Sequence, residues 1–212
     1  MNIAFINSLY GDTLFTDRYR KILDYNKIKH FNLDVNSQGF FEQLKRATHV
    51  IFRYTHYDSD IQLADTILPL IEYQLKKPVF PNQATCWHFD DKVRQYYLFK
   101  EQGFPFIHCD IFWDYDSAIR WIESAARFPT VFKLKGGAGS SNVMLIKSKG
   151  EAMQIARKMF GRGIKPGRIG GDTVQKKASL MRKLKDRYKK VSGRQPDLFY
   201  NRSKDYLLFQ QY

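Results

Sequence analysis

Residues 130–147 read TVFKLKGGAGSSNVMLIK and place a glycine-rich connection between two short apolar runs. The runs begin at Val131 and Val143 and predict two strands joined as a hairpin. Glycine adopts positive φ values and has no side chain, so the backbone N–H groups of such a connection can approach an anion closely. Lys133 and Lys135 add positive charge at its mouth. The stretch predicts a phosphate-binding hairpin, with an ordinary surface turn as the alternative.

Two common phosphate-binding loops do not fit this hairpin. The Walker loop and the dinucleotide fingerprint both need a helix directly after their glycines. In this sequence an apolar, β-branched strand follows instead. The hairpin therefore excludes both of those classes of nucleotide site.

The residues before the hairpin set the order of the elements. Pro81-Asn82-Gln83 ends a predicted strand, Asp91-Lys92 opens a helix to about residue 102, and Gly103-Phe104-Pro105 ends that helix and starts another strand. A helix over residues 117–126, with Asp116-Ser117 as its cap, leads into the lysine hairpin. This order, over residues 78–146, resembles the ATP-grasp superfamily and most closely its RimK-like amino-acid ligase branch. The leucine at position 134 departs from the proline that often follows the lysine in that family.

The resemblance implies roles for particular residues of this sequence. Lys92 and Lys133 would hold nucleotide phosphates, and Lys135 would assist at a mobile glycine-rich lid. The residues implied for that lid are Gly136, Gly137, Gly139, Ser140 and Ser141. Residues 205–212 resemble the hinge strand of the family, which ends in Gln-Glu-aromatic, so the adenine pocket would be lined by Gln210, Gln211 and Tyr212.

The activity implied by the resemblance is ATP-dependent ligation of a carboxylate to an amine or a thiol through an acyl phosphate. ATP and Mg²⁺ are the implied cofactors, and small carboxylates and amines are the implied substrates. In the family the magnesium ligands follow the hinge strand in a further subdomain. We therefore expect residues 1–212 to be the N-terminal part of such a ligase, with no catalytic residue, no metal ligand and no ATP turnover of their own.

Residues 1–84 alternate predicted strands with predicted helices, which is typical of a small open sheet of parallel strands. The strands are predicted at residues 3–7, 30–35, 49–54 and 78–81, with helices at about 12–25, 40–46 and 59–74. Binding residues of such sheets lie at the carboxyl ends of the strands. Asn7 follows the first strand and Arg53 the third, so we predict that both bind substrate.

Arg53 could receive a substrate carboxylate through a bidentate pair. RimK-like proteins also place an arginine at this point of their first domain. The alternative is a structural salt bridge between Arg53 and Asp58 or Asp60, and the residues themselves do not decide between the two.

The formal net charge of +14 is concentrated in one segment. Residues 157–204 hold 16 Lys and Arg against 3 Asp, which accounts for +13 of that total. A glycine-rich connector at 161–171 and a basic helix at 173–190 predict an inserted basic element over residues 161–204. A solvated or docked arm is the favoured interpretation. Attraction of an acidic substrate and contact with nucleic acid or a membrane surface are the alternatives.

Composition narrows the classes of protein further. No apolar run approaches the roughly 20 residues that span a bilayer, and residues 1–7 lack the basic flank of a signal peptide. We therefore expect a cytoplasmic protein without a membrane span. Cys86 and Cys109 are isolated from one another and from any metal-ligand spacing, so we expect two reduced, partly buried thiols.

The sequence thus predicts an α/β protein with a parallel-sheet, pre-ATP-grasp domain over residues 1–84. An α+β ATP-grasp subdomain with a basic helical insertion would follow over residues 85–212. Two other functions remain open. One is a nucleotide-binding or regulatory module without catalysis, and the other is a basic interaction protein on an α/β scaffold.

Overall fold

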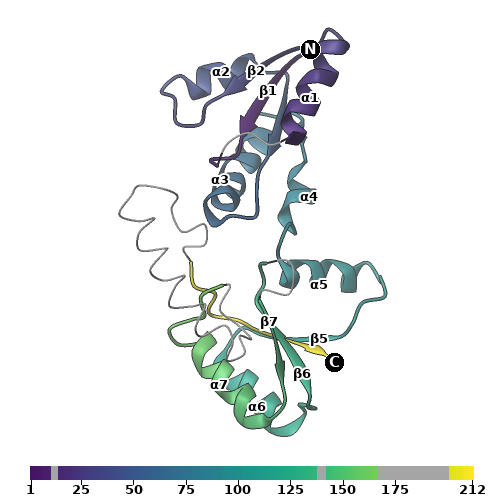
Figure 1. Cartoon of the computed structure of the whole chain (residues 1–212), viewed down its shortest axis with the longest axis vertical. Helices are drawn as coiled ribbons and strands as arrows, with labels where there is room; N and C mark the ends of the chain where they lie inside the picture. Colours follow the sequence, from purple (N-terminus) through teal and green to yellow (C-terminus); the bar gives the residue numbers. More distant parts are fainter. Residues whose placement is uncertain (11–13, 138–141, 167–200) are drawn as a thin grey trace. The chain divides into compact units, whose positions relative to one another are not determined.

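The structure is a computed structural model that describes residues 1–10, 14–137, 142–166 and 201–212 (Figure 1). Its contacts divide the chain into two compact units, Met1–Phe89 and Asp90–Tyr212. The domain boundary proposed from the sequence, between residues 84 and 85, falls inside the short helix α4 (Gln83–Trp87). No helix among these described residues is long and apolar enough to cross a membrane.

The first unit is a four-stranded, entirely parallel sheet, which confirms the α/β class predicted for it. The strands lie in the order β2-β1-β3-β4, where β1 is Asn2–Asn7, β2 is Lys29–Leu33, β3 is His49–Arg53 and β4 is Val79–Phe80. Three helices connect them, α1 (Leu14–Tyr25), α2 (Phe40–Arg46) and α3 (Asp58–Pro69). Parallel neighbours require such crossover connections, because the chain must return to the same end of the sheet.

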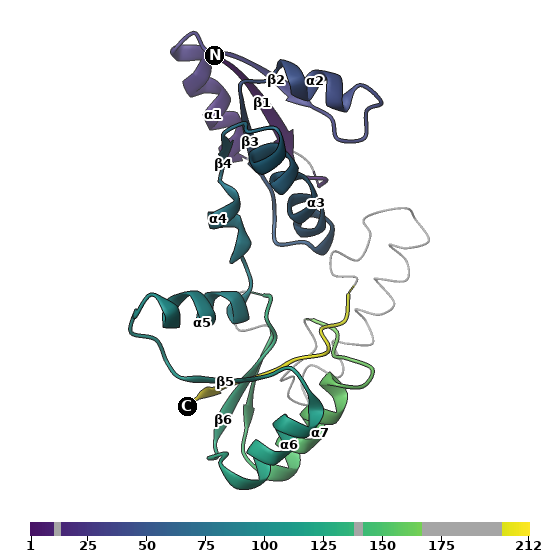
Figure 2. The same cartoon turned by 180° about the vertical axis from the view of Figure 1, so that it is seen from behind.

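Alternation along the strands assigns the helices to two faces of this sheet. Ala4 and Ile6 of β1 pair with Val50 and Phe52 of β3, and all four pack into one core with residues of α2 and α3. Phe5 belongs to the opposite face and meets the guanidinium of Arg20 on α1 at 5.0 Å from its ring centre. Figure 2 shows α1 on one side of the sheet, with α2 and α3 on the other.

The helix predicted at residues 59–74 is divided in the structure. α3 ends at Pro69, and a π-helical turn, η1 (Leu70–Gln74), continues it. Proline has no N–H to donate to the preceding turn, which disturbs the regular hydrogen-bond pattern at this point. The helix α4 was not predicted from the sequence, and Asn82 begins it by accepting the N–H of Thr85 at 2.9 Å.

The second unit contains an antiparallel sheet in the order β5-β8-β6-β7. Its strands are β5 (Cys109–Phe112), β6 (Thr130–Lys133), β7 (Val143–Ile146) and β8 (Leu207–Gln211), and its helices are α5 (Lys92–Glu101), α6 (Tyr115–Ser124) and α7 (Lys149–Met159). β6 and β7 form the predicted hairpin. α6 and α7 lie side by side against one face of the sheet in both views (Figures 1 and 2).

The N-terminal caps of α5 and α6 differ in how well they match the sequence analysis. The helix predicted to open at Asp91-Lys92 is α5, and Asp91 caps it by accepting the N–H groups of Val93 and Arg94 at 3.0 Å each. For α6 the predicted cap at Asp116-Ser117 is wrong, because Asp114 begins the helix and accepts the N–H of Ser117 at 2.8 Å. The cap therefore lies three residues before the amide that it satisfies, which is the usual spacing.

The described ends of the basic insertion lie next to each other. Ile164 and Ser203 exchange two backbone hydrogen bonds of 2.9 Å, and Arg202 donates to the carbonyl of Gly163 at 2.8 Å. The predicted basic helix at residues 173–190 lies outside the described residues. Both cysteines are free, and both are buried where partial burial was predicted.

Candidate functional site

The second sheet has two chemically different faces. Residues that pair across an antiparallel sheet point to the same side, and consecutive residues alternate between sides. Cys109 pairs with Gln210, which pairs with Val131, so these three share a face with Lys133 two residues along β6. We call this the lysine face. Phe132 and Phe209 pair on the opposite, apolar face, where both are fully buried in the core that includes α6 and α7.

Lys133 and Gln210 contact each other on the lysine face, the ammonium of Lys133 donating to Oε1 of Gln210. Cys109 lies beside them, since both influence its titration. Burial raises the pKa of the Cys109 thiol to about 11, and the charge of Lys133 opposes that shift. The strand pairing thus gathers a cation, an amide and a neutral thiol from three different strands.

Lys92, the other lysine implied for phosphate binding, lies in the first turn of α5. Its N–H donates to the carbonyl of Lys135 at 2.9 Å, and its ammonium donates to the carbonyl of Gly137 at 2.7 Å. Burial lowers the pKa of Lys92; the nearby Asp90 opposes this shift, and the positive charge of Lys133 adds to it. The two predicted phosphate lysines therefore lie close enough for their charges to interact.

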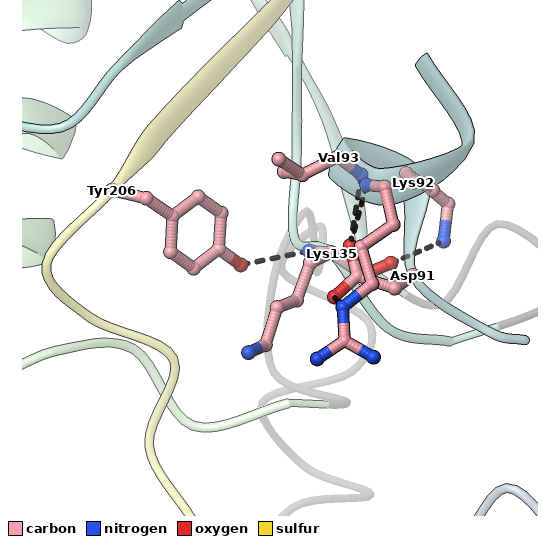
Figure 3. A network of polar contacts seen from close by, with 6 residues as sticks. Asp91, Lys92, Val93, Lys135 and Tyr206 are labelled. Carbon is pink, nitrogen blue, oxygen red and sulfur yellow. Dashed lines mark hydrogen bonds and ion pairs between the residues drawn. The ribbon is translucent and has the colours of Figure 1, made fainter. Parts of the chain in front are cut away.

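Lys135 is held through its backbone rather than its side chain. Its N–H donates to the hydroxyl of Tyr206 at 2.7 Å, and Figure 3 shows this ring reaching from the chain before β8 towards Lys135. Burial is the main cause that raises the pKa of Tyr206 to about 12. The tyrosine thus stays protonated at neutral pH, and its ring anchors the start of the glycine-rich connection. Lys135 itself is an exposed residue.

The described end of the glycine-rich connection requires glycine for a steric reason. Gly137 has φ of +105°, and a Cβ there would lie 2.1 Å from Nδ2 of Asn142. Asn142 is buried and donates from Nδ2 to the carbonyl of Gly136 at 2.9 Å, so it closes the base of the connection. Gly139, Ser140 and Ser141, the other residues predicted for the lid, lie outside the described residues.

The predicted adenine-binding residues differ in their surroundings. Gln210 is buried on the lysine face, whereas Tyr212 is 80% exposed. Gln211 pairs with Thr130, which places its side chain on the other side of the sheet from Gln210. The structure therefore brings Gln210, but not Gln211 or Tyr212, to Lys133.

Sequence reasoning missed three residues of this site. Asp90 accepts the N–H of Gly137, Tyr206 holds Lys135, and Asn142 holds Gly136. Two of these contacts join residues 47 and 71 positions apart along the chain. No local pattern indicates such partners, although an asparagine or aspartate beside a glycine-rich turn is a familiar source of backbone hydrogen bonds.

The first unit brings its two predicted substrate residues together. Asn7 and Arg53 pair directly at the carboxyl ends of β1 and β3. Arg20 of α1, which was not predicted, donates to Oδ1 of Asn7 at 3.1 Å, and the guanidinium of Arg53 lies 4.0 Å from the centre of the Phe15 ring.

Asp60, one of the two salt-bridge partners considered for Arg53, has a different role. This buried carboxylate accepts the N–H of Leu9 at 2.9 Å and the N–H and hydroxyl of Thr55 at 2.8 and 2.7 Å. It thereby ties the segment after β1 to the segment after β3. These bonds hold the carboxyl edge of the sheet in place around Asn7 and Arg53.

Metal ligands were predicted to lie outside this sequence. Within residues 1–10, 14–137, 142–166 and 201–212, no three His, Cys, Asp or Glu side chains are grouped as they would be to hold a metal ion. The described residues therefore contain no such ligand set for Mg²⁺.

Neither a protein-family model nor a curated protein matches this sequence. Solved structures do match its fold. D-alanyl-alanine synthetase A from Vibrio cholerae superposes with a TM-score of 0.54 at 9% identity, over 100% of this chain and 59% of that chain. A RimK domain protein ATP-grasp from Sphaerobacter thermophilus gives a TM-score of 0.51 at 11% identity, over 100% of this chain and 64% of that chain.

A third structure, carboxyaminoimidazole ribonucleotide synthase from Aspergillus clavatus, was solved in complex with ATP. It gives a TM-score of 0.50 at 11% identity, over 98% of this chain and 47% of that chain. These similarities show that the chain has the ATP-grasp fold, as the motifs predicted. The chain spans less than two thirds of the length of each of these three structures.

Proposed function

We propose that this chain binds the phosphates of ATP at the lysine face and contributes to an ATP-dependent ligase. The observation that carries the proposal is that Lys92 and Lys133 lie close together in an ATP-grasp fold, with the Lys92 ammonium bound to the Gly137 backbone. The three come from α5, β6 and the glycine-rich connection. Two ammonium groups beside a side-chain-free backbone segment suit a polyphosphate, which needs both cations and close N–H donors.

The residues of the proposed site have separable tasks. Lys92 and Lys133 would neutralise phosphate charge, and Lys135 would add a third, solvent-facing cation. Gln210 would orient Lys133 from one side, because its Oε1 already accepts from that ammonium. Cys109 and Val131 would border the nucleotide with apolar surface, since both lie on the same face. Gln211 and Tyr212 remain proposals for the adenine pocket.

The reaction proposed is that of the RimK-like branch. A substrate carboxylate would attack the γ-phosphorus of ATP, releasing ADP and leaving an acyl phosphate. An amine or thiol would then attack the acyl carbon and release inorganic phosphate. Positioning and charge neutralisation carry most of the catalysis in phosphoryl transfer, and these are the properties that the lysine face supplies.

Asn7 and Arg53 are proposed to bind the carboxylate substrate in the first unit. Their adjacent places at the carboxyl edge of a parallel sheet support this, and so does the capacity of arginine for bidentate pairing. Mg²⁺ is expected to accompany ATP in such chemistry. The described residues do not form a site that fits this ion.

Titration with ATP tests the phosphate site directly. Lys133→Ala should weaken binding, because a partly desolvated lysine and phosphate pair is worth on the order of 2–5 kcal/mol, which is about 30-fold or more in affinity. Lys147→Ala is the matched control, since it removes an exposed lysine just after β7. Calorimetry of the three proteins, with circular dichroism to check folding, gives the result. Unchanged ATP affinity in Lys133→Ala would show that the lysine face is not the phosphate site.

A further inference from the structure

Asp90 is an acidic residue that lies close to Lys92 and to the glycine-rich connection. Asp90 adopts φ of +50°, a left-handed conformation that aspartate tolerates better than most residues. From there its carboxylate accepts the N–H of Gly137, with both oxygens 3.0 Å from that nitrogen. A Cβ at Gly136 would lie 3.4 Å from Oδ2 of Asp90, which is an ordinary van der Waals distance. The backbone at Gly136 and Gly137 therefore lies next to this carboxylate.

The same glycine is gripped on its other side by Lys92. The ammonium of Lys92 donates to the Gly137 carbonyl at 2.7 Å, while Asp90 holds the Gly137 N–H. The two side chains also interact, because the negative charge of Asp90 supports the protonated form of Lys92 against the effect of burial. Asp90, Lys92 and the Gly137 peptide thus form one closed arrangement, which we call the Asp90 clasp.

Asp91 also supports the protonated form of Lys92, but less than Asp90 does. Its carboxylate is committed to the N-cap of α5 through two hydrogen bonds of 3.0 Å. Asp90 has no such task in the helix. Its described hydrogen bonds go to Gly137, a residue of the connection between β6 and β7.

A carboxylate and a phosphate compete for the same partners. Both are anionic acceptors of backbone N–H groups, and both are stabilised by nearby ammonium groups. In the Asp90 clasp, the N–H of Gly137 and part of the charge of Lys92 are already used by Asp90. A nucleotide phosphate placed at these groups would have to displace the carboxylate or tolerate its repulsion.

We propose that Asp90 is an internal competitor of nucleotide phosphate for the Gly137 N–H and the charge of Lys92, and so sets a lower affinity for nucleotide. This inference rests on the proposed function, because it assumes that phosphate binds at Gly137 and Lys92. Binding would then be an exchange of one anion for another. Release of ADP would be assisted by the return of Asp90 to Gly137.

The test compares wild type with Asp90→Asn, which removes the charge but keeps an oxygen that can accept the Gly137 N–H. Calorimetry would use three probes, ATP, inorganic triphosphate and adenosine. ATP and triphosphate should each bind about fivefold more tightly to Asp90→Asn, as expected for the loss of one nearby repulsive charge. Adenosine should show no gain, because Asp90 competes with phosphate rather than with the base.

Asp116→Asn is the matched control for charge. Asp116 is an exposed residue in the first turn of α6, so its neutralisation changes the net charge equally. It should leave the affinity for all three probes within about twofold of wild type. A gain equal to that of Asp90→Asn would show a general charge effect and overturn the inference.

The remaining outcomes separate this inference from the proposed function. If wild type binds ATP and Asp90→Asn binds it equally or more weakly, Asp90 supports the site instead of competing for it, and only this inference fails. If neither protein binds ATP or triphosphate, both the proposed function and this inference fail. Tighter binding of both phosphate probes by Asp90→Asn alone confirms the Asp90 clasp.

Discussion

The two faces of the second sheet are built from consecutive residues of the same strands but differ in what surrounds them. Phe132 and Phe209 point into a core where neither has exposed surface, and their rings meet at 6.1 Å between centroids. Lys133 and Gln210, the next residues along each strand, lie on the other side and bind each other. Adjacent residues of each strand therefore lie on opposite faces, one packed in the core and one proposed to bind phosphate.

This difference shows how the fold can keep charged groups close together. The apolar face supplies burial, and the stability so gained can hold Lys133 near Lys92 despite the repulsion between their charges. Beside the lysine face, the backbone after β6 is fixed by hydrogen bonds with the side chains of Tyr206, Asn142 and Asp90. Changes on the apolar face should alter stability, and changes on the lysine face should alter ligand affinity.

The largest expected effect comes from Phe209→Ala on the apolar face. Phe209 is fully buried and stacks on Trp121, with ring centroids 5.3 Å apart. Truncation removes that surface and leaves a cavity, so the free energy of unfolding should fall by about 3–5 kcal/mol. Urea unfolding followed by circular dichroism measures the change.

Leu145→Ala is the control for this prediction, because Leu145 pairs with Val131 on the lysine face and is 38% exposed. Its loss should cost about 1 kcal/mol or less. Comparable losses in the two variants would contradict the division of the sheet into a packing face and a binding face.

A smaller effect is expected from Gly137→Ala at the edge of the lysine face. The added methyl would meet Asn142, and alanine is strained at φ of +105°, so the unfolding free energy should fall by about 1–3 kcal/mol. ATP affinity should fall as well, because Asn142 and the Gly137 N–H would both shift. Denaturant unfolding and calorimetry with ATP give the two readouts.

Gly150→Ala provides the comparison for this glycine. Gly150 lies in α7, and nothing approaches within 4 Å of the place that a Cβ would take. Alanine is the better helix former, so this variant should be stabilised by about 0.5–1 kcal/mol. Equal behaviour of the two alanine variants would mean that Gly137 does not depend on its contact with Asn142.

Much of this architecture could be predicted from local patterns. The alternation of strands and helices indicated the parallel sheet, and the hairpin, α2 and β7 were predicted with the bounds or within a residue of those observed. Asp91-Lys92 was predicted to open a helix because the signal is local to the start of that helix. The motifs of residues 78–146 were sufficient to predict the ATP-grasp fold.

The arrangement of the site could not be predicted in the same way. The last strand, β8, lies between β5 and β6, and Thr130 donates its hydroxyl to the carbonyl of Gln210 from 80 positions away. The strand itself was expected at residues 205–212, but its neighbours depend on pairing across a long insertion. For this reason nothing in the sequence indicated that Cys109 and Tyr206 lie beside the lysines predicted to bind phosphate.

The smallest expected effect concerns the titration of Cys109, which combines deep burial with a place beside Lys133. The thiol is only 5% exposed, as on the apolar face, yet it lies beside Lys133. Burial raises its pKa from 9.0 to about 11, with Lys133 acting in the opposite direction. Because the folded pKa lies above the unfolded one, the thiol contributes its stability fully below pH 9, and that contribution is lost as the pH rises through about 11.

Alkylation by iodoacetamide measures this pKa, since only the thiolate reacts. With a pKa of about 11, roughly one thiol in a thousand is ionised at pH 8, so Cys109 should react slowly there and faster by about tenfold per pH unit. Lys133→Met, which removes the charge but keeps much of the side-chain volume, should raise the pKa further and slow alkylation of Cys109 at a given pH. Cys86 in the first unit is the internal control, because Lys133 is not among the groups that shift its pKa. Faster alkylation of Cys109 in Lys133→Met, or an equal change at Cys86, would show that the thiol and the lysine do not share one face of the sheet.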